Sequence, residues 1–338
     1  MLSRRAFART AVSGTAALLA ANSIWRASAS ADAQEQPPAA LDIPSRLFSP
    51  PFLLGFLHPS TNLLTTLAAT EANVGRQADV VLTFATLDGA LHPDIPALLD
   101  AGYEVVVCLE WWDNSRRISD TRFTLAEIAR GAHDAAAARF WRAIAALPRP
   151  VHLRPLHEGN GDWYPWGAYN PLCRSVDYIP AYRRIVSQAW DIAGRDQIRT
   201  QWCMNRKNGR DRTTPIAALY PGDDMVDELV INGYNRPEYA ATIAFETIYR
   251  PAYDQMKAIS YTKPLWVGET ASTEIRGDKA AWIDGLARTV RTSMVFDAIT
   301  WFNRTVTPAT GPVRDWPLDS SVTSLEAFRR LASVRRVG

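Results

Sequence analysis

Residues 151–158 read VHLRPLHE, a short run of strand-forming residues that ends on the carboxylic acid Glu158. Seven further runs of similar length lie before and after it in the chain. Most of them are continuously apolar, which is typical of strands covered on both faces in a parallel sheet. These runs are Phe52–His58, Val80–Thr86, Glu104–Trp111, Ile198–Asn205, Glu228–Asn235, Pro264–Thr270 and Ala298–Asn303.

Stretches with helical spacing separate the runs, for example Leu125–Leu147, Asp177–Ala193 and Asp278–Thr292. A strand followed by a helix, repeated about eight times, predicts an α/β fold, a (β/α)8 TIM barrel that forms one domain over residues 51–338. The alternative is a doubly wound open sheet. That fold usually has a glycine-rich turn after its first strand, and residues 58–61 read HPST instead.

Residues 1–33 have the features of an export signal that is removed from the mature chain. Arg4 and Arg5 precede an apolar run over residues 11–24, an arrangement that resembles a twin-arginine signal. A membrane anchor is disfavoured, because the run is short for a bilayer span. A polar, proline-containing linker is predicted for residues 34–50. We expect the mature protein in the periplasm or outside the cell, without insertion into the membrane.

The overall charge is close to balanced, with 37 lysines and arginines against 35 acidic residues. Such a balance provides no long-range field that would attract nucleic acid or an anionic membrane, so we expect an uncharged partner. The three cysteines form at most one disulfide, and no cluster has the spacing of a metal site. No phosphate-binding loop and no serine-hydrolase motif is present. The sequence therefore does not require a metal or an organic cofactor. We also expect a monomer, although no sequence motif bears on the oligomeric state.

Two predicted strands end on glutamates, Glu158 after the fourth run and Glu269 in the seventh. Functional groups of a parallel barrel lie at the carboxyl ends of its strands, and strands four and seven lie on opposite arcs of the ring. Two facing carboxyl groups are what the cleavage of a glycosidic bond needs. Strand alternation places Arg154 on the same side as Glu158, where it either donates toward the site or pairs with an interior carboxylate. Asn205, which ends the fifth run, has an amide that could reach a sugar hydroxyl.

Small residues stand beside both glutamates, and we interpret them as space for a close-approaching ligand. They are Gly159, Gly161, Gly268 and Ala271. An acid that protonates a leaving group must keep its proton near neutral pH, so the pKa of Glu158 should be raised. Glu269 should remain ionised and needs hydrogen-bond donors.

Residues 154–166, RPLHEGNGDWYPW, resemble the acid/base signature of glycoside hydrolase family 26, the β-mannanase family. Further similar segments occur in the family's order, namely YPGDD at 220–224, NGYN at 232–235, GETASTE at 268–274, WFN at 301–303 and RDW at 314–316. The resemblance implies a retaining double displacement with Glu158 as acid/base and Glu269 as nucleophile. It also implies that Tyr234 steadies the nucleophile and that the sugar subsites are shaped by His157, Trp163 and Trp301.

The resemblance implies an endo-acting hydrolase, with β-1,4-mannan as the first candidate substrate. A β-1,3-xylanase, a mixed-linkage β-glucanase and an enzyme that processes the producer's own exopolysaccharide are alternatives within the same family. A barrel that binds polysaccharide without cleaving it is an alternative of another class. Loss of either carboxyl group would indicate that class, and both Glu158 and Glu269 are present.

Overall fold

The computed structural model describes residues 52–334, apart from residues 114, 116, 212, 238, 240, 309 and 310. The predicted signal at residues 1–33 and the predicted linker at residues 34–50 lie outside the described residues.

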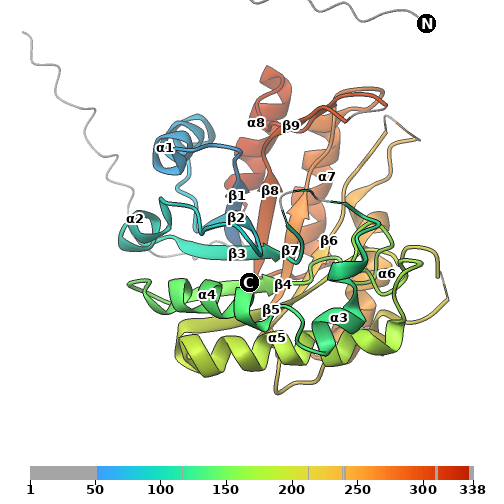
Figure 1. The fold of residues 1–338 in the computed structure, drawn as a ribbon. Helices are drawn as coiled ribbons and strands as arrows, with labels where there is room; N and C mark the ends of the chain where they lie inside the picture. Colours follow the sequence, from blue (N-terminus) through green and yellow to red (C-terminus); the bar gives the residue numbers. More distant parts are fainter. Residues whose placement is uncertain are drawn as a thin grey trace, which may run out of the picture. The chain divides into compact units, whose positions relative to one another are not determined.

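Eight parallel strands close into a barrel in sequence order, which confirms the predicted (β/α)8 architecture (Figure 1). β1 pairs with β8 in a continuous register from Leu53 opposite Ala298 to Leu57 opposite Phe302, so the sheet has no open edge and the doubly wound alternative is wrong. The strands are β1 (Leu53–Leu57), β2 (Val80–Thr86), β3 (Glu104–Glu110), β4 (Val151–Pro155), β5 (Ile198–Asn205), β6 (Glu228–Asn232), β7 (Leu265–Thr270) and β8 (Ala298–Phe302).

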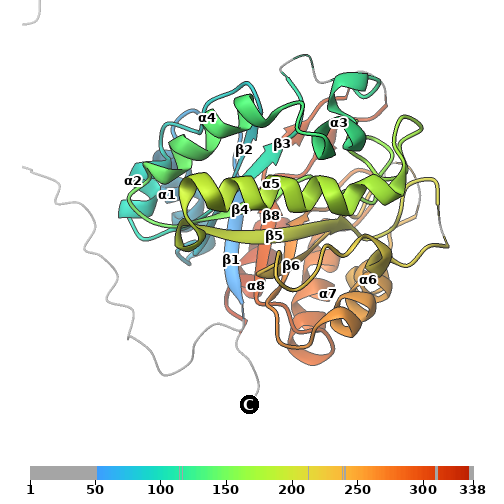
Figure 2. The ribbon, with the colours of Figure 1, turned by 60° about the horizontal axis from the view of Figure 1, so that its bottom comes forward.

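Helices cover the outside of the strands, and Figure 2 shows α4 and α5 packed side by side. The single helix predicted at 125–147 is two helices, because Gly131 adopts a left-handed φ of 86° between them. None of the helices in the described part of the chain is long and apolar enough to cross a membrane. The helices are α1 (Leu63–Val74), α2 (Ile95–Asp100), α3 (Leu125–Ala129), α4 (Asp134–Ala145), α5 (Tyr178–Ala193), α6 (Phe245–Ile259), α7 (Lys279–Thr292) and α8 (Val322–Ala332), with 3-10 turns at Thr121–Phe123, Ser175–Asp177, Arg195–Gln197 and Ile216–Leu219.

The apolar core has two parts. The larger part lies between the strands and the helices. The smaller part, which includes Leu82, Val106 and Trp266, comes from alternate strand residues and contains both Cys108 and Cys203. All three cysteines of the chain are free thiols.

A short hairpin follows β8 and was not predicted from the sequence. Its strands, β9 (Thr305–Val306) and β10 (Arg314–Asp315), are antiparallel. The fully buried Lys279 anchors the segment after β10, since its ammonium donates to the backbone carbonyls of Asp315 and Pro317. This anchor fixes Arg314 and Trp316 beside the mouth of the barrel.

Candidate active site

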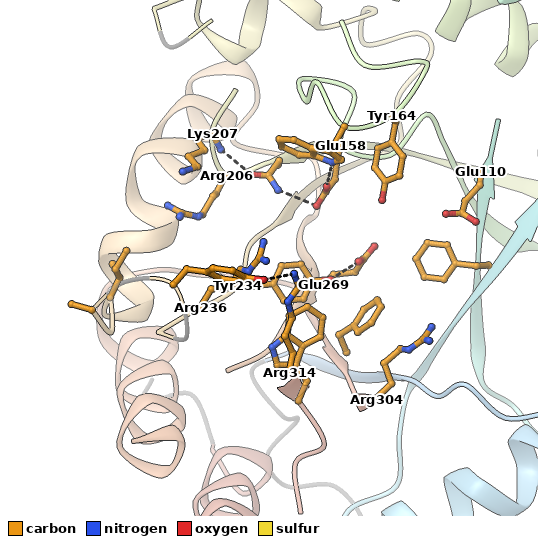
Figure 3. Close-up of a pocket in the computed structure, with 18 residues that line it drawn as sticks. Glu110, Glu158, Tyr164, Arg206, Lys207, Tyr234, Arg236, Glu269, Arg304 and Arg314 are labelled. Atoms are coloured by element: carbon orange, nitrogen blue, oxygen red, sulfur yellow. Dashed lines mark hydrogen bonds between the residues drawn. The ribbon is translucent and has the colours of Figure 1, made fainter. Parts of the chain in front are cut away.

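A cleft of about 770 Å³ opens where the strands end (Figure 3). Among the residues that the structure describes, three carboxyl groups line it, those of Glu110, Glu158 and Glu269. Its aromatic walls are formed by Phe84, Trp163, Tyr164, Tyr234, Tyr239, Phe302 and Trp316. Five cationic side chains also line it, those of Arg206, Lys207, Arg236, Arg304 and Arg314.

Glu158 reaches the cleft through an unusual backbone path. β4 ends at Pro155, and both Leu156 (φ 49°) and Glu158 (φ 52°) adopt the left-handed region, which costs energy for residues with a side chain. The simple strand alternation expected for residues 154–158 is therefore wrong. The Glu158 carboxyl accepts hydrogen bonds from the Trp163 indole at 2.7 Å and from the Asn205 amide at 3.0 Å.

Glu269 is held by two donors of different character. The Tyr234 hydroxyl donates to its Oε2 at 2.6 Å, and Nη1 of the Arg154 guanidinium lies 3.5 Å from its Oε1. The register of β7 is irregular between Val267 and Thr270, which turns this part of the strand. A Cβ at Gly268 would lie 2.3 Å from Val230 Cγ1, 2.7 Å from Asn232 Oδ1 and 3.0 Å from the Arg154 guanidinium carbon, so only glycine fits in this packed part of the barrel.

Burial dominates the electrostatics of the two carboxyl groups. It raises the pKa of Glu158, against the opposing effect of its Asn205 and Trp163 donors. Burial, together with the negative charge of Glu158, raises the pKa of Glu269 to about 7, although Arg154 and Tyr234 act to lower it. Arg154 contacts Glu269 and not Glu158. We therefore place the anion on Glu269 and the shared proton on Glu158.

The amide of Asn232 faces both carboxyl groups and acts to lower the pKa of each. It is fully buried, yet neither of its polar atoms meets the distance and angle of a hydrogen bond. We therefore treat its influence on the two glutamates as a dipole at short range and not as a bond. Asn232 belongs to the NGYN segment at 232–235, but no role at the site was predicted for it.

A chain of buried polar contacts runs down the barrel from Glu269. Nε of Arg154 donates to the side-chain oxygen of Gln201 at 2.8 Å. The side-chain nitrogen of Gln201 in turn donates to the Glu228 carboxylate at 2.8 Å. The two ring nitrogens of His152 contact two carboxylates, that of Glu228 at 2.9 Å and that of Glu104 at 3.0 Å. Burial acts to lower the pKa of His152, but the two carboxylates outweigh it and raise that pKa to about 9.

The predicted site residues divide into two groups. Trp163, Asn205 and Tyr234 line the cleft beside the two glutamates. His157 and Arg154 do not line it. The His157 ring is buried and packs edge-on against Phe84 and Tyr164, so it supports the wall from behind.

Trp301 also lies outside the cleft, contrary to the prediction. It is fully buried, packs against Phe328 on α8, and donates to the backbone carbonyl of Trp316 at 2.9 Å. Successive side chains of a strand point to opposite faces, so Phe302 faces the cleft when Trp301 faces the helices.

The small residues beside the glutamates make room for the protein itself and not for a ligand. A side chain at Gly159 would lie 2.2 Å from the Tyr178 ring, and one at Gly161 would lie 2.7 Å from the Trp163 ring. Ala271 is fully buried. Tight internal packing therefore accounts for these positions.

Sequence reasoning missed several residues that line the cleft, above all Tyr164, Phe302, Trp316 and the five cations. Trp316 stacks on Tyr234, with ring centroids 4.6 Å apart, although it comes from the unpredicted hairpin segment. A signal for most of the cations existed in the sequence. Arg206, Lys207, Arg236 and Arg304 each stand within four residues after a strand end.

Comparison of the sequence with known proteins identifies a matching family and several relatives. The sequence profile described as "Glycosyl hydrolase family 26" matches residues 114–285. The chain is 30% identical over 266 residues to Endoglucanase H of Acetivibrio thermocellus, a match that covers 75% of this chain and 27% of that protein. It is also 30% identical over 157 residues to a mannan endo-1,4-beta-mannosidase of Bacillus subtilis, with 45% and 39% covered. The chain thus spans well under half the length of these curated relatives.

Solved structures agree on the fold. The catalytic domain of a GH26 endo-beta-1,4-mannanase from Bacillus sp. JAMB-750 superposes with a TM-score of 0.63 at 18% identity, covering 83% of this chain and 85% of that one. A GH26 beta-mannanase from Bacteroides ovatus gives a TM-score of 0.58 at 16% identity, with 83% and 88% covered.

Proposed function

This chain belongs to glycosyl hydrolase family 26, and from that membership we propose that it hydrolyses a β-linked polysaccharide, with Glu158 as the acid/base and Glu269 as the nucleophile. The observation that carries the proposal is the buried pair of carboxyl groups from β4 and β7. Within the described part of the chain, Glu269 has an ion pair with a cation, and Glu158 has none. This asymmetry suits one group that stays charged and one that carries the proton.

In the proposed reaction, a carboxylate oxygen of Glu269 attacks the anomeric carbon while Glu158 gives its proton to the departing glycosidic oxygen. Glu158 then takes a proton from the water that releases the sugar from Glu269. Tyr234 and Arg154 hold the attacking carboxylate in place, and Trp163 and Asn205 hold the acid. The aromatic rings of the cleft provide flat faces on which pyranose rings can stack.

We take the β-1,4-mannan backbone as the first candidate substrate, with endo-acting cleavage. The mannosidase names of the Bacillus subtilis and Bifidobacterium adolescentis relatives support it. The name Endoglucanase H supports β-glucan as the second candidate. The match to that relative covers 75% of this chain but only 27% of that protein. β-1,3-Xylan and an exopolysaccharide backbone are further candidate substrates, to be assayed together with β-1,4-mannan and β-glucan.

Replacement of the two glutamates tests the mechanism. Glu269→Ala should lower kcat on mannan by at least about a thousandfold, because no nucleophile remains. Glu158→Ala should lower the polysaccharide rate to a similar degree but spare aryl β-mannosides with acidic leaving groups, because those need little proton donation. The measurement is the steady-state rate on both kinds of substrate.

Glu110→Ala is the matched control, since this third carboxyl group also lines the cleft. It should reduce the rate far less than either of the other two changes. Equal losses from Glu158→Ala on both kinds of substrate would contradict its role as the acid. Substantial activity in Glu269→Ala would contradict the role of Glu269 as the nucleophile.

A further inference from the structure

The near-neutral balance of the whole chain does not extend to the cleft. Among the described residues that line it, five are cationic and three are acidic. One of the three acids, Glu158, carries a proton in the proposed reaction. The described lining residues then carry five positive charges against two negative ones, although the complete chain has a formal charge of only +2.

The five cations come from separate elements, so they are not the exposed face of one helix or a single charged run. Arg206 and Lys207 directly follow β5, Arg236 follows β6, Arg304 follows β8, and Arg314 lies in β10. In Figure 3, Arg206, Lys207 and Arg236 lie on one side of the two central glutamates, and Arg304 lies on the other. The positive charge thus extends to both sides of the proposed cleavage point.

Several of these groups are held in position. The Arg236 and Arg314 guanidinium carbons lie 4.7 Å and 5.7 Å from the centre of the Tyr239 ring, and Arg314 also donates to the Tyr239 hydroxyl at 3.1 Å. Arg314 lies over Trp316 as well. The side chain of Arg304, in contrast, has no hydrogen bond or ion pair with any residue that the structure describes.

A neutral sugar needs hydrogen-bond donors, which asparagine, serine or backbone amides supply without charge. Five like charges gathered in one cleft repel one another, and they raise the local concentration of anions. Arginine is the side chain whose planar fork matches a carboxylate with two parallel hydrogen bonds. The lining therefore fits an acidic ligand better than a neutral one.

We propose that the cleft binds an acidic polysaccharide, a β-linked backbone that carries carboxylate groups on both sides of the bond to be cleaved. Arg206, Lys207 and Arg236 pair with carboxylates on one side, together with Arg314, which shares the Tyr239 ring with Arg236, and Arg304 pairs with one on the other side (Figure 3). The carboxylate belongs either to a uronic acid of the backbone or to an acidic substituent. This inference rests on the proposed hydrolytic function and specifies its substrate class.

The first test compares matched polymers with the purified chain. Neutral glucomannan is compared with glucomannan oxidised to the carboxylate at C6 and with carboxymethyl glucomannan. At low salt, kcat/KM on a carboxylated polymer should exceed that on the neutral one by about tenfold or more. The advantage should shrink at roughly 0.3 M salt, because exposed charges are then screened. Preference for the C6-oxidised polymer indicates uronic acid, and preference for the carboxymethyl polymer indicates a substituent.

The second test uses variants that remove single charges. Arg304→Gln and Lys207→Gln should each lower the ratio of acidic to neutral activity by roughly three- to tenfold, as expected for one lost contact between a cation and a carboxylate. Arg142→Gln is the matched control, because Arg142 is exposed on α4 and does not line the cleft. It should leave the ratio as it is in the original chain.

The outcomes separate this inference from the proposed function. Equal or better cleavage of neutral glucomannan at every salt concentration would overturn the inference and leave the hydrolase standing. If no polymer is cleaved, affinity gels with the Glu269→Ala variant decide. Retention by the carboxylated polymers alone would support the inference and count against hydrolysis of this backbone, and retention by none would overturn both.

Discussion

At the scale of single residues, the two glutamates depend on each other. The charge of Glu158 is the second cause, after burial, of the raised pKa of Glu269. Glu269 must be ionised in order to attack while Glu158 keeps its proton, so burial alone of these two causes acts, and kcat/KM should rise at a pH above the ordinary glutamate value and below about 7. The raised pKa of Glu158 should bring the decline at higher pH.

Glu158→Gln should leave the acid limb of this profile at the same pH, because Glu158 is already uncharged when Glu269 ionises in the active form. The measurement is kcat/KM against pH, on an aryl β-mannoside whose leaving group needs no proton. An acid limb that moved to lower pH in the variant would show that Glu158 is charged when Glu269 ionises, and would contradict the placement of the proton on Glu158.

At the scale of elements, β3, β4, β5 and β6 carry a polar chain through a barrel interior that is otherwise apolar. His152 is its charged centre, with a pKa of about 9 against an ordinary 6.5. A histidine whose pKa is raised by folding stabilises the protein fully below its unfolded pKa. That contribution is lost as the pH rises through the folded pKa.

The free energy of unfolding should therefore fall between pH 6.5 and 9, by on the order of 3 kcal/mol from this residue. Urea unfolding across that range measures it. His152→Gln should be less stable at pH 6.5, and its stability should depend less on pH. A variant that retained the full pH dependence would assign the effect to other groups.

At the scale of the whole molecule, the near-neutral net charge does not show that five cationic side chains gather at the cleft. The expectation of an uncharged partner followed from 37 cations against 35 acids, and it disregarded where the chain brings those charges together.

Export from the cell is a second property at the scale of the whole molecule. We propose that residues 1–33 direct export of the folded chain, which is consistent with its three free thiols and absence of a disulfide framework.

Replacing both Arg4 and Arg5 by lysine should block export through the twin-arginine route. The chain should then accumulate in the cytoplasm of the expressing bacterium with its signal uncleaved. The measurement is the distribution of the chain between cell fractions. Arg9→Lys, in the same segment but outside the pair, is the control and should leave export intact. Normal export of the double variant would contradict the assignment.

The sequence by itself determined the eight strands and the two glutamates, Glu158 after β4 and Glu269 near the end of β7. Buried parallel strands leave continuous local runs, and the rule that function lies at strand ends needs only the order of elements. The tertiary structure alone decided which neighbour faces the cleft, as with Phe302 and Trp301. It also decided that Arg154 reaches Glu269 and that cations from separate strand ends converge. These features depend on strand register, backbone bends and contacts between residues far apart in the chain, which local sequence patterns do not encode.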